Sequence, residues 1–549
     1  MIKGARATYF FILSILMLAA QPLVAQETPG TVNEALKAQP TLEAPKPAPK
    51  IEAPRRAKGV APAGGKKIKV KKFVFKGNTV FSSKELSAQI KDYTQRKITL
   101  LEIYDAADLI TQYYVDRGYA LASANVPAQK VDGGTIKLEI IEGKVGVVGT
   151  DKNEVYSGEQ IKGYVDLPKG TLYTSTPLEN ALKRLNELPG LAAKAVIKPG
   201  EDYGTSDLII QVQESRFGAS ATVDNHGRRS TGRTRYTLAG ALNNPLQLGD
   251  QLQIVKLLSE GSRLDYTYGG YNVPLSVHGP RLYLSYGKAL FKVLGAAPIE
   301  GISETGRAYL EQVFLRSDNQ RLSATAGYTR IVSNVNALGV PVTATNVTVY
   351  DFGATYNQSY SHGGVTQYVA SIATDFQDQA RADCAPAPGS GCKHQPFKFS
   401  MNVQHLQPIY HGLEALVRFD QVFSADILPD STAFSAGGPN GARGYASAEI
   451  RGDEGYSLSV DFRYGINVPY ARVTPRVFVD YAAVNRHDAA SRALTESDAI
   501  GDYGVGLDVR FPYNVFITAD YAQAMTRGHL SSDGGNSHQR IFAKASVNF

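Results

Sequence analysis

The sequence ends in IFAKASVNF, from Ile541 to Phe549, where apolar and polar residues alternate. Successive side chains of a β-strand point to opposite faces of the sheet, so this pattern predicts a strand with one apolar face. That face carries Ile541, Ala543, Ala545, Val547 and Phe549. A face of this kind packs against lipid or a protein core, and here its last residue is aromatic.

The same alternation fills the chain from Phe217 onward, in segments of about ten residues. Examples are 235–242, 264–268, 282–286, 322–328, 397–403, 456–462 and 515–521. We distinguish about sixteen segments, and bacterial single-chain membrane barrels have an even number of antiparallel strands. Alternating strands are neutral on average, which agrees with a hydrophobic content of 43% and a mean hydropathy of −0.20. No apolar run after the first thirty residues reaches the length of about 20 that a membrane helix needs.

The connections between these segments fall into two classes. One set is tight: 246–250, 277–280, 317–320, 361–364, 410–412, 468–472 and 512–514. The other set is longer and irregular: 293–306, 377–393, 428–455, 485–500 and 526–538. Short periplasmic turns opposite long outer loops are typical of outer-membrane barrels, whereas a soluble β-sandwich or propeller does not explain the asymmetry. We therefore predict a transmembrane β-barrel of about 16 antiparallel strands over residues 216–549.

The N-terminal segment predicts export. Lys3 and Arg6 form a positive region, and the apolar run from Phe10 to Ala20 has the length of a signal-peptide core. Ala20 or Ala25 closes a small-residue cleavage site, so residues 1–25 are expected to be a signal peptide. Residues 26–66 are rich in Ala, Pro and Lys, and they predict an extended, flexible linker.

A small α+β unit is expected over residues 67–144. Ser82 with Glu85 and Thr99 with Glu102 form two capping boxes, each of which starts a helix. The strands of this unit are expected at 68–75, 121–126 and 136–141. The order of elements is therefore β-α-α-β-β.

The same order recurs over residues 145–215. Strands are expected at 145–148, 195–197 and 208–212, and a first helix at 158–165. A second helix is predicted to start at Thr176 and to end at Pro189-Gly190, with Leu178, Leu182, Leu185 and Leu188 on one side. The two units are an internal repeat.

Six motifs stand out in the repeats and at the start of the barrel. They are FKGNTVFSSKEL, ITQYYVDRGYALASANVP, IKLEIIEGKVG, LENALKRLNELPG, GTSDLIIQVQE and TVDNHGRRSTGRTRYTLAGALNNPLQLGDQL. Together they resemble the transporter component of two-partner secretion systems, the ShlB/FhaC/HecB-type haemolysin secretion/activation proteins. The resemblance runs from about Lys67 to Phe549. It implies an outer-membrane pore with two periplasmic POTRA domains, which secretes an unfolded exoprotein. The client is expected to be a haemolysin or a filamentous adhesin, and an inhibition toxin stays open.

Two further motifs carry the resemblance into the barrel. GARGY, from Gly441 to Tyr445, lies in the long loop 428–455 and is similar to the family's (V/I)RGY/F tip, which folds into the lumen. VFVDYA, from Val477 to Ala482, is similar to the family's F-x-D-x-G motif on the barrel wall. The resemblance implies that the tip and the wall lock together through Arg443, Gly444, Tyr445, Phe478 and Asp480, with Arg443 and Asp480 as an ion pair.

The sequence departs from the family pattern at two positions. Ala442 replaces the usual branched residue and Ala482 replaces glycine, so the close packing that a glycine permits is not expected at position 482. The tripeptide Arg451-Gly452-Asp453 lies in the same loop, and we interpret its match to an adhesive motif as chance.

The implied partners are a secreted exoprotein with an N-terminal secretion domain, outer-membrane lipid and the barrel-assembly machinery, for which Val547 and Phe549 would form an insertion signal. The chain is not expected to be an enzyme, because no nucleophile elbow, phosphate loop or His-Glu-x-x-His motif occurs. No metal, cofactor or nucleic acid is implied. Two alternatives stay open: a barrel-assembly factor, which usually carries more POTRA copies, and a passive solute porin, which has no need of the repeats.

The only cysteines are Cys384 and Cys392, in a Pro- and Gly-rich stretch of a predicted outer loop. Two closely spaced thiols in an exported loop predict a small disulfide. A redox or zinc site would need more partners than the nearby His394.

Cys384 and Cys392 should be joined in the mature protein, which constrains the loop by about 2–3 kcal/mol. A thiol reagent should therefore label the protein only after reduction. Replacing both, as Cys384→Ala with Cys392→Ala, should leave export near normal because the loop is expected to be remote from the lumen. A reactive thiol in the untreated protein would contradict the bond.

Overall fold

The structure, a computed structural model, describes Leu36, Leu42, Ile51–Glu52 and residues 67–293, 298–377, 396–439, 441–487, 489, 495–525 and 539–549. The predicted signal peptide and the predicted Cys384–Cys392 disulfide lie outside these residues. The chain divides into two compact units, one mainly of residues 47–216 and the other mainly of 217–245 and 250–549. Among the described helices, none is long and apolar enough to span a membrane.

The first repeat of the N-terminal unit is a three-stranded sheet in the order β3-β6-β5, with helices packed on one face. Its elements are β2 (Ile68–Val70), β3 (Lys72–Lys76), α3 (Ser83–Gln89), a 3-10 turn (Lys91–Tyr93), β4 (Arg96–Ile98), α4 (Leu100–Val115), β5 (Ser123–Asn125) and β6 (Thr135–Ile141). The single strand predicted at 68–75 is two strands, because the chain changes partner at Lys71. Strand β2 pairs antiparallel with β4, and β3 pairs parallel with β6.

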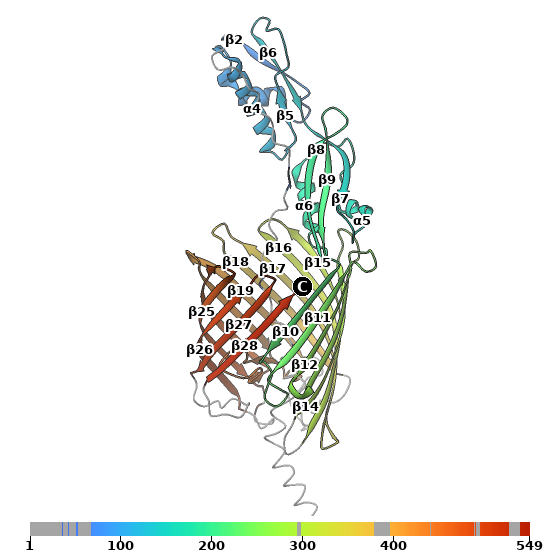
Figure 1. Cartoon of the computed structure of the whole chain (residues 1–549), viewed down its shortest axis with the longest axis vertical. Coiled ribbons are helices and arrows are strands. Elements are labelled where there is room, and N and C mark those ends of the chain that lie inside the picture. Colours follow the sequence, from blue (N-terminus) through green and yellow to red (C-terminus); the bar gives the residue numbers. More distant parts are fainter. Residues whose placement is uncertain are drawn as a thin grey trace, which may run out of the picture. The chain divides into compact units, whose positions relative to one another are not determined.

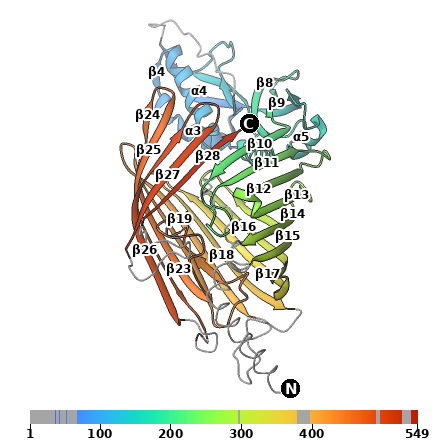
Figure 2. The ribbon, with the colours of Figure 1, turned by 60° about the horizontal axis from the view of Figure 1, so that its bottom comes forward.

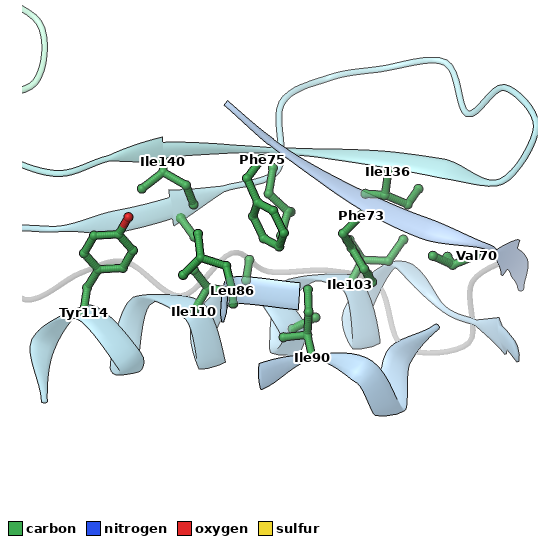
Figure 3. Close-up of a cluster of buried hydrophobic side chains, with 14 of the residues drawn as sticks. Val70, Phe73, Phe75, Leu86, Ile90, Ile103, Ile110, Tyr114, Ile136 and Ile140 are labelled. Atoms are coloured by element: carbon green, nitrogen blue, oxygen red, sulfur yellow. The ribbon is translucent and has the colours of Figure 1, made fainter. Parts of the chain in front are cut away.

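The helices of this repeat start where the capping residues predicted them to start. In both capping boxes the hydroxyl accepts a bond from the third helical amide, and the glutamate accepts one from the cap residue's own amide. Figure 3 shows the resulting core, in which Phe73, Phe75, Ile136 and Ile140 of the sheet face Leu86, Ile103, Ile110 and Tyr114 of the helices. Apolar burial between one helical layer and one sheet face therefore holds this repeat together.

The second repeat has the same architecture, with the sheet order β1-β8-β9-β7. Its elements are β7 (Lys144–Asp151), α5 (Gly158–Tyr164), α6 (Ser175–Leu185), β8 (Leu191–Pro199) and β9 (Thr205–Glu214), with β1 (Ile51–Glu52) added from the linker. The prediction that the second helix continues to Pro189 was wrong. The helix ends at Leu185 because the Asn186 side chain bonds both backbone groups of Ala193, which turns the chain into β8.

A carboxylate at the end of the last strand anchors each repeat. In the first repeat Glu142 accepts bonds from the Thr79 hydroxyl, from the amides of Thr79 (2.7 Å) and Val80 (2.8 Å) and from the Tyr114 hydroxyl (2.9 Å). Burial by itself raises the pKa of Glu142, but these hydrogen bonds outweigh it and lower the pKa below its usual value. In the second repeat Glu214 accepts bonds from three consecutive amides, 154–156, in the equivalent loop. Each carboxylate therefore fixes the segment that leads into the first helix of its repeat.

The second unit is a closed antiparallel β-barrel (Figures 1 and 2). Its strands are β10 (Phe217–Asp224), β11 (Arg235–Asn243), β12 (Gln251–Ser259), β13 (Leu264–Pro274), β14 (Arg281–Val293), β15 (Ile299–Arg316), β16 (Gln320–Ala337), β17 (Val340–Ser359), β18 (Val365–Gln377), β19 (Phe397–Tyr410), β20 (Leu413–Ser424), β23 (Glu454–Tyr464), β24 (Ile466–Val468), β25 (Ala471–Asn485), β26 (Ser497–Arg510), β27 (Val515–Ala524) and β28 (Gln539–Asn548). Because β23 and β24 both pair with β25 and are separated only by Gly465, they form one strand, and the barrel has 16. The prediction of about sixteen strands is confirmed.

The register of neighbouring strands separates the two faces of the barrel wall. On β28 the predicted apolar face turns outward, since Ile541 is 62% exposed whereas Phe542 on the other face is 2% exposed. The barrel closes where β10 pairs with β28 over Ser220–Asp224. Two predicted loops were too long. Residues 299–306 of the expected loop 293–306 belong to β15, which pairs with β14 up to Val293. Residues 497–500 of the expected loop 485–500 belong to β26, which pairs with the end of β25.

Replacing Glu142 with Gln should destabilise a soluble fragment of residues 67–216 by about 1–3 kcal/mol at pH 7, because it removes a charged acceptor from four donors. A glutamate whose folded-state pKa is lowered contributes stability that is complete above its unfolded pKa of about 4.3 and is lost as the pH falls through the folded value. Urea unfolding at several pH values tests this. Glu142→Gln should flatten the loss of stability on acidification, whereas the exposed control Glu201→Gln should match the parent. Equal urea midpoints for both variants would show that Glu142 is no anchor.

Candidate functional site

The candidate site is the connection between β20 and β23, residues 425–453. Two short strands within it, β21 (Phe434–Ala436) and β22 (Ile450–Gly452), pair antiparallel and carry the tip with Arg443 between them. Asp453 fixes the base of the connection, since its buried carboxylate accepts bonds from the amides of Leu428 (2.8 Å) and His487 (2.9 Å). Arg451 forms an ion pair with Asp430. The Arg451-Gly452-Asp453 tripeptide is therefore part of the loop's framework.

The guanidinium of Arg443 is buried inside the barrel, with 2% of the residue exposed. It binds Asp480 of β25 through two bonds, Nε to Oδ2 and Nη2 to Oδ1, both at 2.8 Å. The backbone amide of Arg443 also donates to Asp480, at 3.2 Å. Planar two-point contacts of this kind are among the strongest and most directional hydrogen bonds in proteins. The structure thus brings together the two residues that the resemblance paired.

A second carboxylate, which the sequence did not reveal, also binds Arg443. Asp461 of β23 accepts from Nη2 at 2.5 Å, and Ser459 accepts from the same nitrogen at 3.1 Å. Asp461 is shared with Arg418 of β20, whose Nη2 lies 3.3 Å away. The alternation of the predicted strand 456–462 placed Ser459 and Asp461 on one face. It could not show that this face meets the loop tip.

Aromatic and small residues shape the rest of the tip's seat. The guanidinium carbon of Arg443 lies 3.4 Å from the centroid of the Phe478 ring, a cation–π contact. That ring lies over Gly504 of β26, where an added Cβ would come within 2.4 Å of it. Gly444 approaches Asp502 so closely that a Cβ at position 444 would lie 2.8 Å from the Asp502 Cβ. Both glycines are therefore required by close approach.

The other residues of the tip are buried among apolar neighbours. Tyr445 is 1% exposed and donates its hydroxyl to the Gly501 carbonyl at 3.2 Å. Ala482, which stands where the family pattern has glycine, is fully buried in the same cluster as Tyr445, Ala442 and Phe434. The tip also bonds to a second loop, because Arg228 donates to the Ser447 carbonyl at 2.6 Å.

The wall around the tip is rich in paired charges. Arg476 binds Asp508 and Asp520, and Arg235 binds Asp224 at 2.7 Å. These residues line a lumenal cavity of about 1060 Å³, together with Arg418, Arg443 and Asp461. A polar lumen that faces water can hold such pairs at modest cost, because the charges are not stranded in lipid. Among the described residues, no group of three or more His, Cys, Asp or Glu is placed to hold a metal ion.

The remaining predicted residues lie elsewhere. Val547 pairs with Ala221 of β10 and Val515 of β27 on the outer face of the barrel. The amide of Phe549 donates to the Ala219 carbonyl at 2.8 Å, and its side chain is 79% exposed. Their role as an insertion signal stays a prediction.

Comparisons with known proteins agree with this architecture. The family model for the haemolysin secretion/activation protein ShlB/FhaC/HecB matches residues 204–509, more than half of the chain. The model for the ShlB-type POTRA domain matches residues 68–143. The chain belongs to the ShlB/FhaC/HecB family. It is an outer-membrane transporter for protein secretion, and the POTRA domains of this family lie in the periplasm.

Individual relatives are distant in sequence but match over most of their length. The heme/hemopexin transporter protein HuxB of Haemophilus influenzae strain 86-028NP is 24% identical over 440 residues, 75% of each chain. The hemolysin transporter protein ShlB of Serratia marcescens is 22% identical over 430 residues, 74% of each. The solved structure of CdiB from Escherichia coli has a TM-score of 0.66 at 18% identity and covers 98% of both chains, which shows the fold.

Removing one member of a buried ion pair typically costs about 3–5 kcal/mol. Arg443→Ala and Asp480→Ala should each lower the temperature at which the barrel unfolds on semi-native gels and should impair export. Because the two residues act as a unit, the double variant should be little worse than either single variant.

Asp502→Asn is the matched control. Asp502 lies opposite Asp480 in the β25–β26 register, and among the described residues neither oxygen of its buried carboxylate has a hydrogen-bond partner. Neutralising Asp502 breaks no hydrogen bond of its carboxylate and removes repulsion from Asp480, so this variant should not lower the melting temperature. Strictly additive losses for Arg443→Ala and Asp480→Ala would mean that the pair does not form.

Proposed function

We propose that this transporter captures an unfolded exoprotein at its POTRA sheet edges and passes it through the lumen once the Arg443 tip has left its seat. The observation that carries the proposal is the contact of Arg443 with Asp480 and Asp461 inside the barrel. A tip held by hydrogen-bonded ion pairs in a wet lumen can be released as a unit, because water or a polar client can replace the same bonds. A tip packed only by apolar residues would lack such replacements.

The sheet edges of the POTRA domains support the capture step. An extended peptide can add a strand to an open sheet edge through main-chain hydrogen bonds, a mode that tolerates many side-chain sequences. In the second repeat β1 already adds to β8 in parallel, with Ile51 opposite Ala195 and Glu52 opposite Val196. The described part of this linker, Ile51 and Glu52, pairs with two of the nine residues of β8, which is one example of strand addition at this edge.

The client is proposed to be a large exoprotein with an N-terminal secretion domain, a haemolysin or a filamentous adhesin. Relatives with similar architecture are named for different cargoes, a heme/hemopexin transporter in one species and a hemolysin transporter in another. Edge capture by main-chain bonds is compatible with such variety, because most of the binding does not depend on the client's side chains. Folding of the client outside the cell would drive its movement without a nucleotide.

The alternatives explain less of the molecule. A passive solute porin has no use for the two repeats, which make up most of residues 67–216. A barrel-assembly factor shares the fold, and a BamA barrel from Haemophilus ducreyi gives a TM-score of 0.56 at 14% identity. That likeness shows the fold alone, whereas the family model that matches more than half of the chain is one of secretion proteins.

Deleting residues 67–215 should abolish export while the barrel still inserts, because the capture surface is lost and all barrel strands remain. The measurement is client in the medium, compared at equal amounts of heat-modifiable barrel in the outer membrane. Export that persists in the deletion at normal barrel levels would remove the POTRA domains from the mechanism. Loss of both export and barrel insertion would instead assign these residues to biogenesis.

A further inference from the structure

The register of the barrel assigns every strand side chain to the lumen or to the lipid, because directly opposed residues share a face. On β12, Val255 and Leu257 line the lumenal cavity, so Lys256 between them faces outward. Its ammonium forms an ion pair with Asp265 of β13 and donates to Thr267 at 2.9 Å. Both partners are outward residues of the neighbouring strand.

Strands β14 and β15 continue this pattern. Lys288 lies opposite Glu304 and Lys292 lies opposite Glu300, with Nζ–Oε1 distances of 3.2 and 2.9 Å. Glu304 also accepts a bond from the outward Tyr286 hydroxyl at 2.9 Å. We call these residues the outer charged face: Lys256, Asp265, Lys288, Lys292, Glu300 and Glu304.

The outer charged face occupies one side of the barrel. Among the described wall strands, an outward-facing Lys or Arg occurs only on β12, β14 and β16. The outward cation of β16 is Arg330. The other wall strands, β17–β20, β23–β28, β10 and β11, direct all their described Lys and Arg side chains into the lumen. A general need for solubility would not confine outward cations to neighbouring strands of a barrel. The asymmetry calls for a specific ligand.

The height of the outer charged face on the barrel shows which part of the membrane a ligand of this face would occupy. The strands run outward from the periplasmic turns, and Lys288 is seven residues beyond Arg281 at the start of β14. At about 3.4 Å per residue and a tilt of about 40°, this is about 18 Å above the turn, and Lys292 lies at about 29 Å. Lys256, five residues beyond Gln251 on β12, lies at about 13 Å. The face therefore extends from the middle of an apolar band of about 25 Å to its outer edge. Lys292 reaches the headgroup layer directly, and the long stem of Lys288 carries its ammonium toward that layer. The deeper Lys256 is paired with Asp265.

We propose that the outer charged face binds the phosphorylated disaccharide headgroup of the outer-leaflet glycolipid, lipid A of lipopolysaccharide. Lys288 and Lys292 are four residues apart on one face of one strand, a spacing of about 13 Å that suits two phosphates at opposite ends of a disaccharide. Each ammonium has three donors, and the carboxylate beside it uses one, so further donors can reach phosphate. The half-exposed carboxylates can hold divalent cations that bridge to the same phosphates.

The experiment measures binding of bis-phosphorylated lipid A to the purified full-length protein in detergent with millimolar Mg²⁺. The variant Lys256→Gln/Lys288→Gln/Lys292→Gln should bind at least about tenfold more weakly, since each surface lysine near an anionic lipid contributes about 1 kcal/mol. The variant that replaces the same three lysines with Arg should keep most of the binding. A control that removes three exposed POTRA lysines, Lys84→Gln/Lys91→Gln/Lys130→Gln, changes the net charge equally and should bind as the parent does.

Each remaining outcome is decisive. Lipid A without its phosphates should bind the parent protein as weakly as bis-phosphorylated lipid A binds the Gln variant. Equal binding of both lipids would overturn the site, as would full competition by equimolar inorganic phosphate, which would indicate a simple anion site. Binding unchanged in the Gln variant, with the barrel intact by heat modifiability, would leave the face to a protein partner and end the proposal.

Discussion

The barrel exists because a backbone amide or carbonyl cannot be left unpaired in hydrocarbon. Every spanning strand needs a neighbour on both sides, so the first and last strands, β10 and β28, must meet. They do so over Ser220–Asp224, and the bonds between Phe549 and Ala219 extend the seam. Closure fixes which face of each strand sees lipid and which sees water. The alternation of the sequence and the position of the loop tip both follow from it.

Closure also explains why charge is concentrated inside the wall. A residue that turns inward meets water or another side chain, so Arg443, Asp461 and Asp480 can be buried together at tolerable cost. Close packing holds the tip in place together with the ion pairs. Gly444 and Gly504 leave room for Asp502 and the Phe478 ring, which sets the guanidinium at the distance where both carboxylates reach it.

On the outer surface charge is disfavoured, because an unpaired charge that faces lipid is costly. The free-energy cost falls only toward the membrane interfaces. The outward lysines are accordingly paired with acids of the next strand, and Lys292 lies near the outer end of β14. In the periplasmic repeats, where water is available, the equivalent anchoring task falls to single carboxylates, Glu142 and Glu214, which bind loop amides. Each environment thus determines how a charge is used.

The sequence by itself determined the parts that depend on local periodicity. Alternation along Ile541–Phe549 and its upstream counterparts predicted the strands and their faces, and the capping boxes at Ser82 and Thr99 placed the helix starts. It also supplied Arg443 and Asp480, through motifs rather than through geometry. Tertiary structure alone decided that Asp461 and Arg418 join this pair, that α6 stops at Leu185, and that lysines on β12 and β14 face one side. These depend on which strands become neighbours, and a pattern of period two is the same for every choice of neighbour.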